Sequence, residues 1–165
     1  MIECYSNSMV ETPSSEAPAG ALLEGLPPVA HPSARVLVLG SMPGVRSLEE
    51  QRYYAHPRNA FWPIVEPLIG VSGNRAYPER LDALVASGIA LWDVIGVCRR
   101  PGSLDSRIET DSIAVNDLGG LVKQCPKLAL VAFNGARAEQ EFRRRVLPDL
   151  GPAEERIDRV RLPST

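Results

Sequence analysis

The sequence predicts an α/β fold, a three-layer open sandwich around a central, mostly parallel four-stranded sheet. Two observations lead to this class. Residues 35–39 (RVLVL), 89–95 (IALWDVI) and 128–133 (LALVAF) are apolar at nearly every position, which is typical of strands buried on both faces. Helical patterns separate these runs, and alternating strands and helices imply right-handed crossovers within one sheet.

The individual strands and helices can be predicted in chain order. Residues 1–28 are rich in Pro, Ser, Ala, Glu and Gly and lack an apolar period, so we expect a mostly disordered leader before a domain at 29–165. A fourth, alternating strand is expected at 159–162. Pro63 suits the first turn of a helix, whereas Pro67 should kink or end it. The helices are expected at residues 61–69, 79–87, 111–124 and 136–146.

Composition excludes several classes of protein. No window approaches the roughly 20 apolar residues of a membrane span, and no basic segment precedes an apolar run as in a secretory signal. The three cysteines, Cys4, Cys98 and Cys125, are far apart, which suits a reducing cytoplasm. We expect no metal site, because only two histidines could join these cysteines as ligands.

Charge is unevenly distributed along the chain. The net charge is −2, but residues 1–34 contain four Glu and no Lys or Arg, so residues 35–165 carry a net charge of +2. A nearly neutral domain attracts nucleic acid only weakly as a whole. Any DNA-binding surface must therefore be a local patch.

The segments that follow the predicted strands are candidates for a binding site, because open α/β sheets bind ligands beyond the carboxyl ends of their strands. They are residues 40–44, 96–100, 134–135 and 163–165. In the first segment, the glycines let the backbone approach a ligand, and its amides can donate to a base edge or a phosphate. A plain strand-to-helix turn is the alternative, and no Gly-Lys-Ser/Thr follows to make a P-loop.

The stretch YYAHPRNAFW, residues 53–62, is unusually aromatic for a loop. Tyr54 can offer a flat face to a base, and such stacking contributes ~1–3 kcal/mol per base. Asn59 has a donor and an acceptor that can hold water or a base edge, and it can equally cap a helix that begins at Ala60. Phe61 and Trp62 suit the core better than a site, and His56 before a proline can cap a turn.

Other polar segments have plainer alternatives. The paired arginines and hydroxyl groups of residues 99–106 suit phosphates, although a solvated loop explains them as well. Residues 143–145 are three arginines on a predicted helix and indicate a solvated face. Asn134 with the following glycine is first of all a turn signal.

Residues 39–62 (LGSMPGVRSLEEQRYYAHPRNAFW) resemble the first motif of the uracil-DNA glycosylase superfamily. The mismatch-specific branch has a Gly-x-x-Pro-Gly turn followed by an aromatic-Ala-His-Pro-x-Asn-x-Phe-Trp segment. GSMPG with YYAHPRNAFW is more similar to the hypoxanthine-DNA glycosylase branch, called family six, as are LWDVIGVCRRPGSLDSRI and VAFNGARAEQEFRRRV. The resemblance runs from about residue 26 to residue 165.

The resemblance implies a monofunctional glycosylase, without metal or nucleotide cofactor, that removes hypoxanthine from DNA. Uracil is a second candidate base, and the preference among hypoxanthine, uracil and xanthine stays open. Met42 stands where the mismatch-specific branch has its catalytic Asn, and the working amide of the hypoxanthine branch maps onto Asn59. Tyr54 maps onto the aromatic residue that stacks on the flipped base. The second motif begins at Leu162, so we expect the chain ending at Thr165 to be truncated there and impaired on duplex DNA.

The expected site therefore has one catalytic residue, Asn59. The expected base-binding residues are Gly40, Ser41, Met42, Pro43, Gly44, Tyr54, His56 and Asn134. The expected DNA contacts are Arg52, Arg58, Arg99 and Ser164. The expected partner is DNA containing deaminated bases, bound by a cytoplasmic monomer without a membrane. Two alternatives stay open: a damaged-DNA-binding module with little catalysis, and an α/β hydrolase of free nucleosides.

Overall fold

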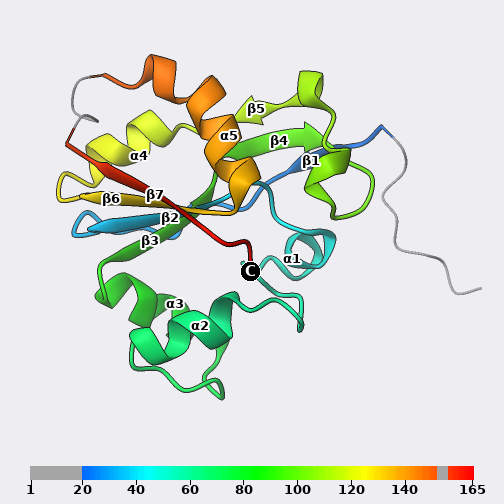
Figure 1. Cartoon of the computed structure of the whole chain (residues 1–165). Coiled ribbons are helices and arrows are strands. Elements are labelled where there is room, and N and C mark those ends of the chain that lie inside the picture. Colours follow the sequence, from blue (N-terminus) through cyan, green and yellow to red (C-terminus); the bar gives the residue numbers. More distant parts are fainter. Residues whose placement is uncertain (1–19, 152–155) are drawn as a thin grey trace, which may run out of the picture.

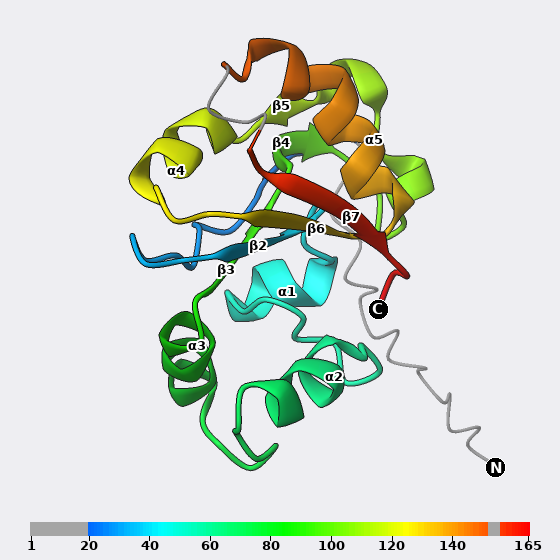
Figure 2. The ribbon, with the colours of Figure 1, turned by 60° about the vertical axis from the view of Figure 1, so that its left-hand side comes forward.

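The computed structural model describes residues 20–151 and 156–165, and its architecture is α/β (Figure 1). The central sheet contains four parallel strands. Their spatial order is β3 (Ile89–Asp93), β2 (Val36–Gly40), β6 (Leu130–Asn134) and β7 (Asp158–Leu162). Figure 2 shows α4 and α5 over one face of this sheet and α1, α2 and α3 beneath the other. The predicted three-layer class is confirmed.

The described helices are α1 (Val45–Glu50), α2 (Phe61–Leu68), α3 (Tyr77–Ala86), α4 (Leu118–Gln124) and α5 (Ala136–Arg145). Helix α2 ends one residue beyond Pro67, as predicted for a proline that removes a backbone donor. The helix expected at 111–124 is wrong over its first half. The N-cap of α4 is Asp117, whose Oδ1 accepts from the Gly120 N–H at 2.7 Å. Helix α4 therefore begins only at Leu118.

A second, antiparallel sheet was not predicted. Its order is β1 (Leu22–Glu24), β4 (Ile95–Arg99) and β5 (Ala114–Val115). The apolar run at 89–95 is therefore not one strand, because Val94 separates β3 from β4. Both sides of the break are buried, so the apolar pattern carries no sign of it. As a consequence, most of the 96–100 segment is strand rather than a loop at the edge of the main sheet.

The leader expected at residues 1–28 is wrong for its last part. Leu22–Glu24 pairs with β4, and Leu26 is only 5% exposed in the core. The Pro- and Gly-rich composition did not reveal this, because β1 is held by backbone pairing to an edge that β4 supplies. The remainder of the expected leader, residues 1–19, lies outside the described residues.

The core lies on both faces of the central sheet. Leu37 and Leu39 of β2 pack on the face of α4 and α5, whereas Val38 packs on the face of α2 and α3. Alternate residues of one strand point to opposite faces, so a strand covered on both sides is apolar throughout. Strand β7 forms the exposed edge of the sheet. None of the helices in the described ranges is long and apolar enough to cross a membrane.

Candidate functional site

A pocket of about 560 Å³ opens at the carboxyl ends of the central strands. The last residues of three strands, Gly40, Asp93 and Asn134, line it together. Parallel strands end at one edge of a sheet, which is why residues so far apart in sequence meet here. The other lining residues are Ser41, Met42, Pro43, Gly44, Arg46, Ser47, Tyr53, Tyr54, His56, Arg58, Asn59, Ser103, Leu104, Asp105, Ser164 and Thr165.

The turn after β2 brings backbone to the pocket wall. A Cβ on Gly40 would lie 2.3 Å from Asp93 Oδ1, so only glycine allows this approach. The Met42 side chain is 6% exposed and packs with Ile95 and Cys98, away from solvent. The turn therefore offers main-chain groups, because its largest side chain is part of the core.

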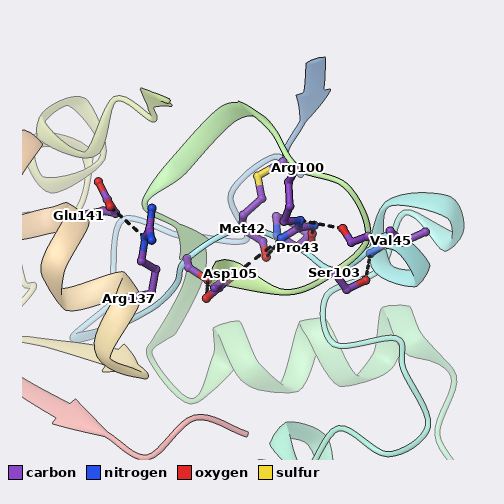
Figure 3. Close-up of polar contacts among 10 residues, drawn as sticks. Met42, Pro43, Val45, Arg100, Ser103, Asp105, Arg137 and Glu141 are labelled. Atoms are coloured by element: carbon purple, nitrogen blue, oxygen red, sulfur yellow. Dashed lines mark hydrogen bonds and ion pairs between the residues drawn. The ribbon is translucent and has the colours of Figure 1, made fainter. Parts of the chain in front are cut away.

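The buried guanidinium of Arg100 holds this turn in place through hydrogen bonds and an ion pair (Figure 3). Arg100 is 3% exposed and donates to the carbonyl oxygens of Met42, at 3.4 Å, and of Pro43. It also lies 3.8 Å from the carboxylate of Asp105, which accepts a hydrogen bond of 2.5 Å from the Ser41 hydroxyl. Arg100 thus points inward, and its contacts are with the turn rather than with solvent or a phosphate.

Tyr54 is held rigidly at the pocket wall. Its φ of +53° is in the left-handed region, and its ring stacks on Phe61 with centroids 3.9 Å apart. Its hydroxyl accepts from Asn134 Nδ2 at 2.9 Å. Burial, reinforced by the charge of Asp93, raises the pKa of Tyr54, so the phenol stays neutral. The result is a preorganised aromatic face beside the turn.

Asn59 closes the turn that leads into α2 and also lines the pocket. Its Oδ1 accepts from the Phe61 N–H at 2.8 Å and so closes a local turn just before α2. The predicted cap is displaced by one residue, because α2 begins at Phe61 and its N-cap is Ala60. Its Nδ2 donates to the Thr165 carbonyl at 3.1 Å across the pocket. The amide keeps a second lone pair on Oδ1 and a second N–H for a ligand.

Asn134 ties the end of β6 to the residues after β7. Its Oδ1 accepts from the Thr165 N–H at 3.1 Å, and its Nδ2 donates to the Thr165 hydroxyl and to Tyr54. Both amide hydrogens are therefore in use. The structure gives Asn134 a bracing position between Tyr54 and Thr165, beside Ser164 in the pocket lining.

The remaining predicted residues divide into two groups. His56 and Arg58 are exposed and line the pocket, and His56 Nδ1 accepts from the backbone N–H of Arg58 at 3.2 Å. Arg52 and Arg99 are not among the lining residues. The Arg52 guanidinium lies 5.6 Å from the centre of the Tyr77 ring, and Arg99 Nε donates to the Gly20 carbonyl at 3.0 Å. Their contacts with DNA stay a prediction.

Sequence reasoning missed Asp93. This residue is 4% exposed at the end of β3, and its Oδ2 has no hydrogen-bond partner among the described residues. The pKa of Asp93 is raised to about 7, chiefly by burial and also by the charge of the nearby Asp105, while Arg100 opposes the shift. The available signal was a lone carboxylate inside the apolar run IALWDVI.

Within residues 20–151 and 156–165, no three His, Cys, Asp or Glu side chains gather as a metal site would require. The expectation of a cofactor-free site stays a prediction, to be tested by chelation.

The fold and the pocket together define a class: an open α/β sandwich with an aromatic and polar ligand site at the carboxyl edge of its sheet. The family model "Uracil DNA glycosylase superfamily" matches residues 27–163. The chain belongs to this superfamily.

Individual relatives agree with the family. A hypoxanthine DNA glycosylase of Methanosarcina acetivorans is 38% identical over 146 residues, covering 83% of this chain and 91% of that protein. A hypoxanthine DNA glycosylase of Methanosarcina barkeri is 38% identical over 116 residues, 70% and 72% of the two chains. The solution structure of a candidate uracil DNA glycosylase from Methanosarcina acetivorans superposes with a TM-score of 0.71 at 34% identity, covering 87% and 84%.

Proposed function

We propose that this protein is a DNA glycosylase that hydrolyses the bond between C1′ of deoxyinosine and N9 of its base and so releases hypoxanthine. One observation carries the proposal. A single pocket gathers the turn of residues 40–44, the stacked ring of Tyr54 and the amide of Asn59 in a chain of the uracil-DNA glycosylase superfamily. Relatives named hypoxanthine DNA glycosylase support the choice of base.

The pocket suits a base taken out of the DNA stack. Its volume lies within the range of about 300–1,000 Å³ found for small-molecule sites. Extruding a nucleotide costs a few kcal/mol of stacking and pairing, which contact with the Tyr54 face partly offsets. Because Phe61 supports that ring from behind, little side-chain freedom is lost when a base binds.

Asn59 is the proposed catalytic residue. Breaking the C1′–N9 bond leaves positive charge on the sugar and negative charge on the departing purine. Water adds its hydroxyl to C1′, and its proton ends on the base. With its remaining lone pair Asn59 can orient this water, and with its free N–H it can stabilise the negative charge.

Base release from a matched set of oligonucleotides tests the proposal. Each oligonucleotide carries one deoxyinosine, deoxyuridine or deoxyxanthosine, and abasic sites are detected by alkaline cleavage. We expect release from deoxyinosine at an undiminished rate in the presence of a chelator. Cleavage of free inosine without release from DNA would identify a nucleoside hydrolase. Binding to deoxyinosine DNA without release would identify a binding module.

Monomeric state and cytoplasmic location complete the proposal. Both cysteines within the described residues, Cys98 and Cys125, are free and buried, which agrees with a reducing compartment. Light scattering coupled to size exclusion tests the monomer, and fractionation of cells that express the tagged protein tests the location.

A further inference from the structure

The loop after β4 leaves one leucine in solvent at the rim of the pocket. Leu104 lines the pocket and is nevertheless 61% exposed, so its side chain lies at the rim rather than in the interior. Among the large hydrophobic side chains that are exposed in residues 20–151 and 156–165, Leu104 is the one that lines this pocket. Single exposed leucines are ordinary on protein surfaces, so position and rigidity decide whether this one has a function.

Both neighbours of Leu104 are fixed to the turn that follows β2. Ser103 Oγ accepts from the backbone N–H of Val45 at 2.9 Å (Figure 3). Asp105 Oδ2 accepts from the Ser41 hydroxyl at 2.5 Å. The backbone of Leu104 is thus held between two anchors, and its exposed side chain extends from a rigid support.

The same segment contributes an apolar residue to the core at another position. Ile108 is 5% exposed and packs with Met42, Ile95 and Cys98. Leu104 gains no comparable burial in the free protein. A ligand that covers Leu104 therefore removes apolar surface from water while ordering little additional chain.

The charges at the same rim indicate the kind of ligand. Arg46 and Arg58 line the pocket and are exposed. Arg46 also pairs with Glu50 at 2.7 Å, so Arg58 is the stronger candidate for a phosphate contact. The carboxylate of Asp105, next in sequence to the leucine, is engaged by the Ser41 hydroxyl. An apolar side chain that shares a rim with exposed arginines suits a nucleic acid strand, which offers phosphates and flat apolar base faces together.

Resting on the proposed function, we propose that Leu104 packs against the face of the base next to the extruded nucleotide. Extrusion leaves that face unstacked, and a leucine fixed at the mouth of the receiving pocket lies beside the gap. This contact comes from the loop after β4 and is separate from the second motif that begins at Leu162. Leu104 touches no reacting atom, so it favours the extruded state rather than the chemical step.

The experiment measures Kd by fluorescence anisotropy on single-stranded oligonucleotides with adenine on both sides of a deoxyinosine analogue. A fluorine at the 2′ position of the sugar blocks base release, because it destabilises the positive charge that develops there. We expect Leu104→Ala to bind this oligonucleotide about tenfold more weakly than the unaltered protein, because three apolar carbon atoms are lost from the contact. With deoxyadenosine in place of the analogue, no base is extruded and the two proteins should bind equally.

Removal of a neighbouring base tests which surface Leu104 covers. Two further oligonucleotides carry an abasic spacer on the 5′ or the 3′ side of the analogue. On one of the two, the ratio of the Kd values of Leu104→Ala and the unaltered protein should fall from about tenfold to below about twofold, because the base face is missing. A ratio that stays near tenfold with both spacers overturns the proposal.

Matched variants distinguish a contact with DNA from a structural role. Leu68→Ala is the control, because Leu68 is a 77% exposed leucine of α2 that is not among the lining residues. It should bind every oligonucleotide as the unaltered protein does. Leu104→Met keeps an apolar side chain of similar length and should bind within about twofold of the unaltered protein. Leu104→Asn is of similar size but polar, so it should bind as weakly as Leu104→Ala.

The outcomes separate the two proposals. If the unaltered protein releases hypoxanthine but Leu104→Ala binds the analogue as tightly as Leu68→Ala does, the role of Leu104 is overturned and the glycosylase proposal stands. If the unaltered protein releases no hypoxanthine, the glycosylase proposal fails and the role of Leu104 falls with it. A dimer in light scattering that Leu104→Ala converts to a monomer would assign the leucine to a contact between two copies of this chain and would also overturn the proposal.

Discussion

At the residue scale, the Asn59 side chain has one contact that any folded form needs and one that faces the pocket. Its Oδ1 accepts from the Phe61 N–H where the chain enters α2, and its Nδ2 donates to the Thr165 carbonyl. An asparagine that only capped the helix could be exchanged for another good cap. A catalytic asparagine could not, because a hydroxyl supplies neither the reach nor the second donor of the amide.

Substitution of Asn59 separates these two tasks. Asn59→Ala should lower single-turnover release of hypoxanthine about 10²–10³-fold, the usual effect of removing one preorganised polar group, and should destabilise the fold by only ~1 kcal/mol. Asn59→Ser keeps a capping oxygen, so it should regain most of the stability and little of the rate. Recovery of both by serine would assign Asn59 to capping alone.

Asp93 makes stability depend on pH in a direction opposite to most carboxylates. Its pKa is about 7 in the folded state and about 4 in an unfolded chain, so the folded state binds the extra proton between these values. Stability should therefore fall as pH rises from about 4 to about 7 and change little above that. Urea unfolding at pH 5 and pH 8 should show a difference on the order of a few kcal/mol between unaltered protein and Asp93→Asn. An identical pH response in both proteins would exclude a buried, titrating Asp93.

At the element scale, the turn after β2 depends on β4 and the loop behind it. Residues 41–43 receive polar contacts from Arg100 and Asp105, and Val45 at the start of α1 donates its backbone N–H to Ser103 Oγ at 2.9 Å. Figure 3 shows Arg100, Asp105 and Ser103 around the turn, with their polar contacts as dashed lines. The pocket wall is thus shaped by a segment some sixty residues further along the chain.

Removal of Arg100 should loosen that wall. Arg100→Met leaves the carbonyl oxygens of Met42 and Pro43 unpaired in the interior, so we expect a loss of ~2–3 kcal/mol in urea unfolding and a lower rate at saturating substrate. The ion pair with Asp105 adds little, because the Asp105 side chain is 39% exposed. Arg75→Met is the matched control, since Arg75 is an exposed surface residue, and it should change stability by less than ~0.5 kcal/mol. Equal losses of stability in Arg100→Met and Arg75→Met would show that Arg100 does not hold the turn in place.

At the scale of the whole molecule, the distribution of charge determines how strongly and through which surface the protein binds DNA. The chain has a net charge of −2, and residues 35–165 carry only +2, so no broad positive surface can supply the affinity. Arg46 and Arg58 are the arginines among the residues that line the pocket. Binding should then rest on a few phosphate contacts near the pocket mouth.

The salt dependence of binding measures the number of those contacts. Each phosphate neutralised on a single strand contributes about −0.7 to the slope of log K against log salt, so two to four contacts predict a slope between roughly −1.4 and −2.8. Arg58→Ala should make the slope about 0.7 less steep. Arg75 is exposed and is not among the lining residues, so Arg75→Ala should leave the slope unchanged. Fluorescence anisotropy with a labelled single strand provides the measurement. A slope steeper than about −5 would require an extensive basic surface and contradict the local-patch prediction.

The sequence by itself determined the fold class, because strands buried on both faces must be apolar throughout and helices must separate parallel strands. It also indicated most of the pocket. The turn of residues 40–44 and Asn134 stand at strand ends, and the carboxyl ends of parallel strands share one edge. Tyr54 and Asn59 lie in the loop between α1 and α2, and the aromatic segment at 53–62 indicated them.

Only the tertiary structure decided which segments far apart in the sequence contact one another. It divided the run at 89–95 between two sheets, paired Leu22–Glu24 with β4, turned Arg100 inward and placed Asp93 unpaired in the pocket wall. Each of these depends on a partner far away in the chain, and neither apolar periodicity nor residue type identifies such a partner. The physical reason is that burial and electrostatic environment arise from packing between elements, so the ionisation of Asp93 follows from its neighbours rather than from its own position in the sequence.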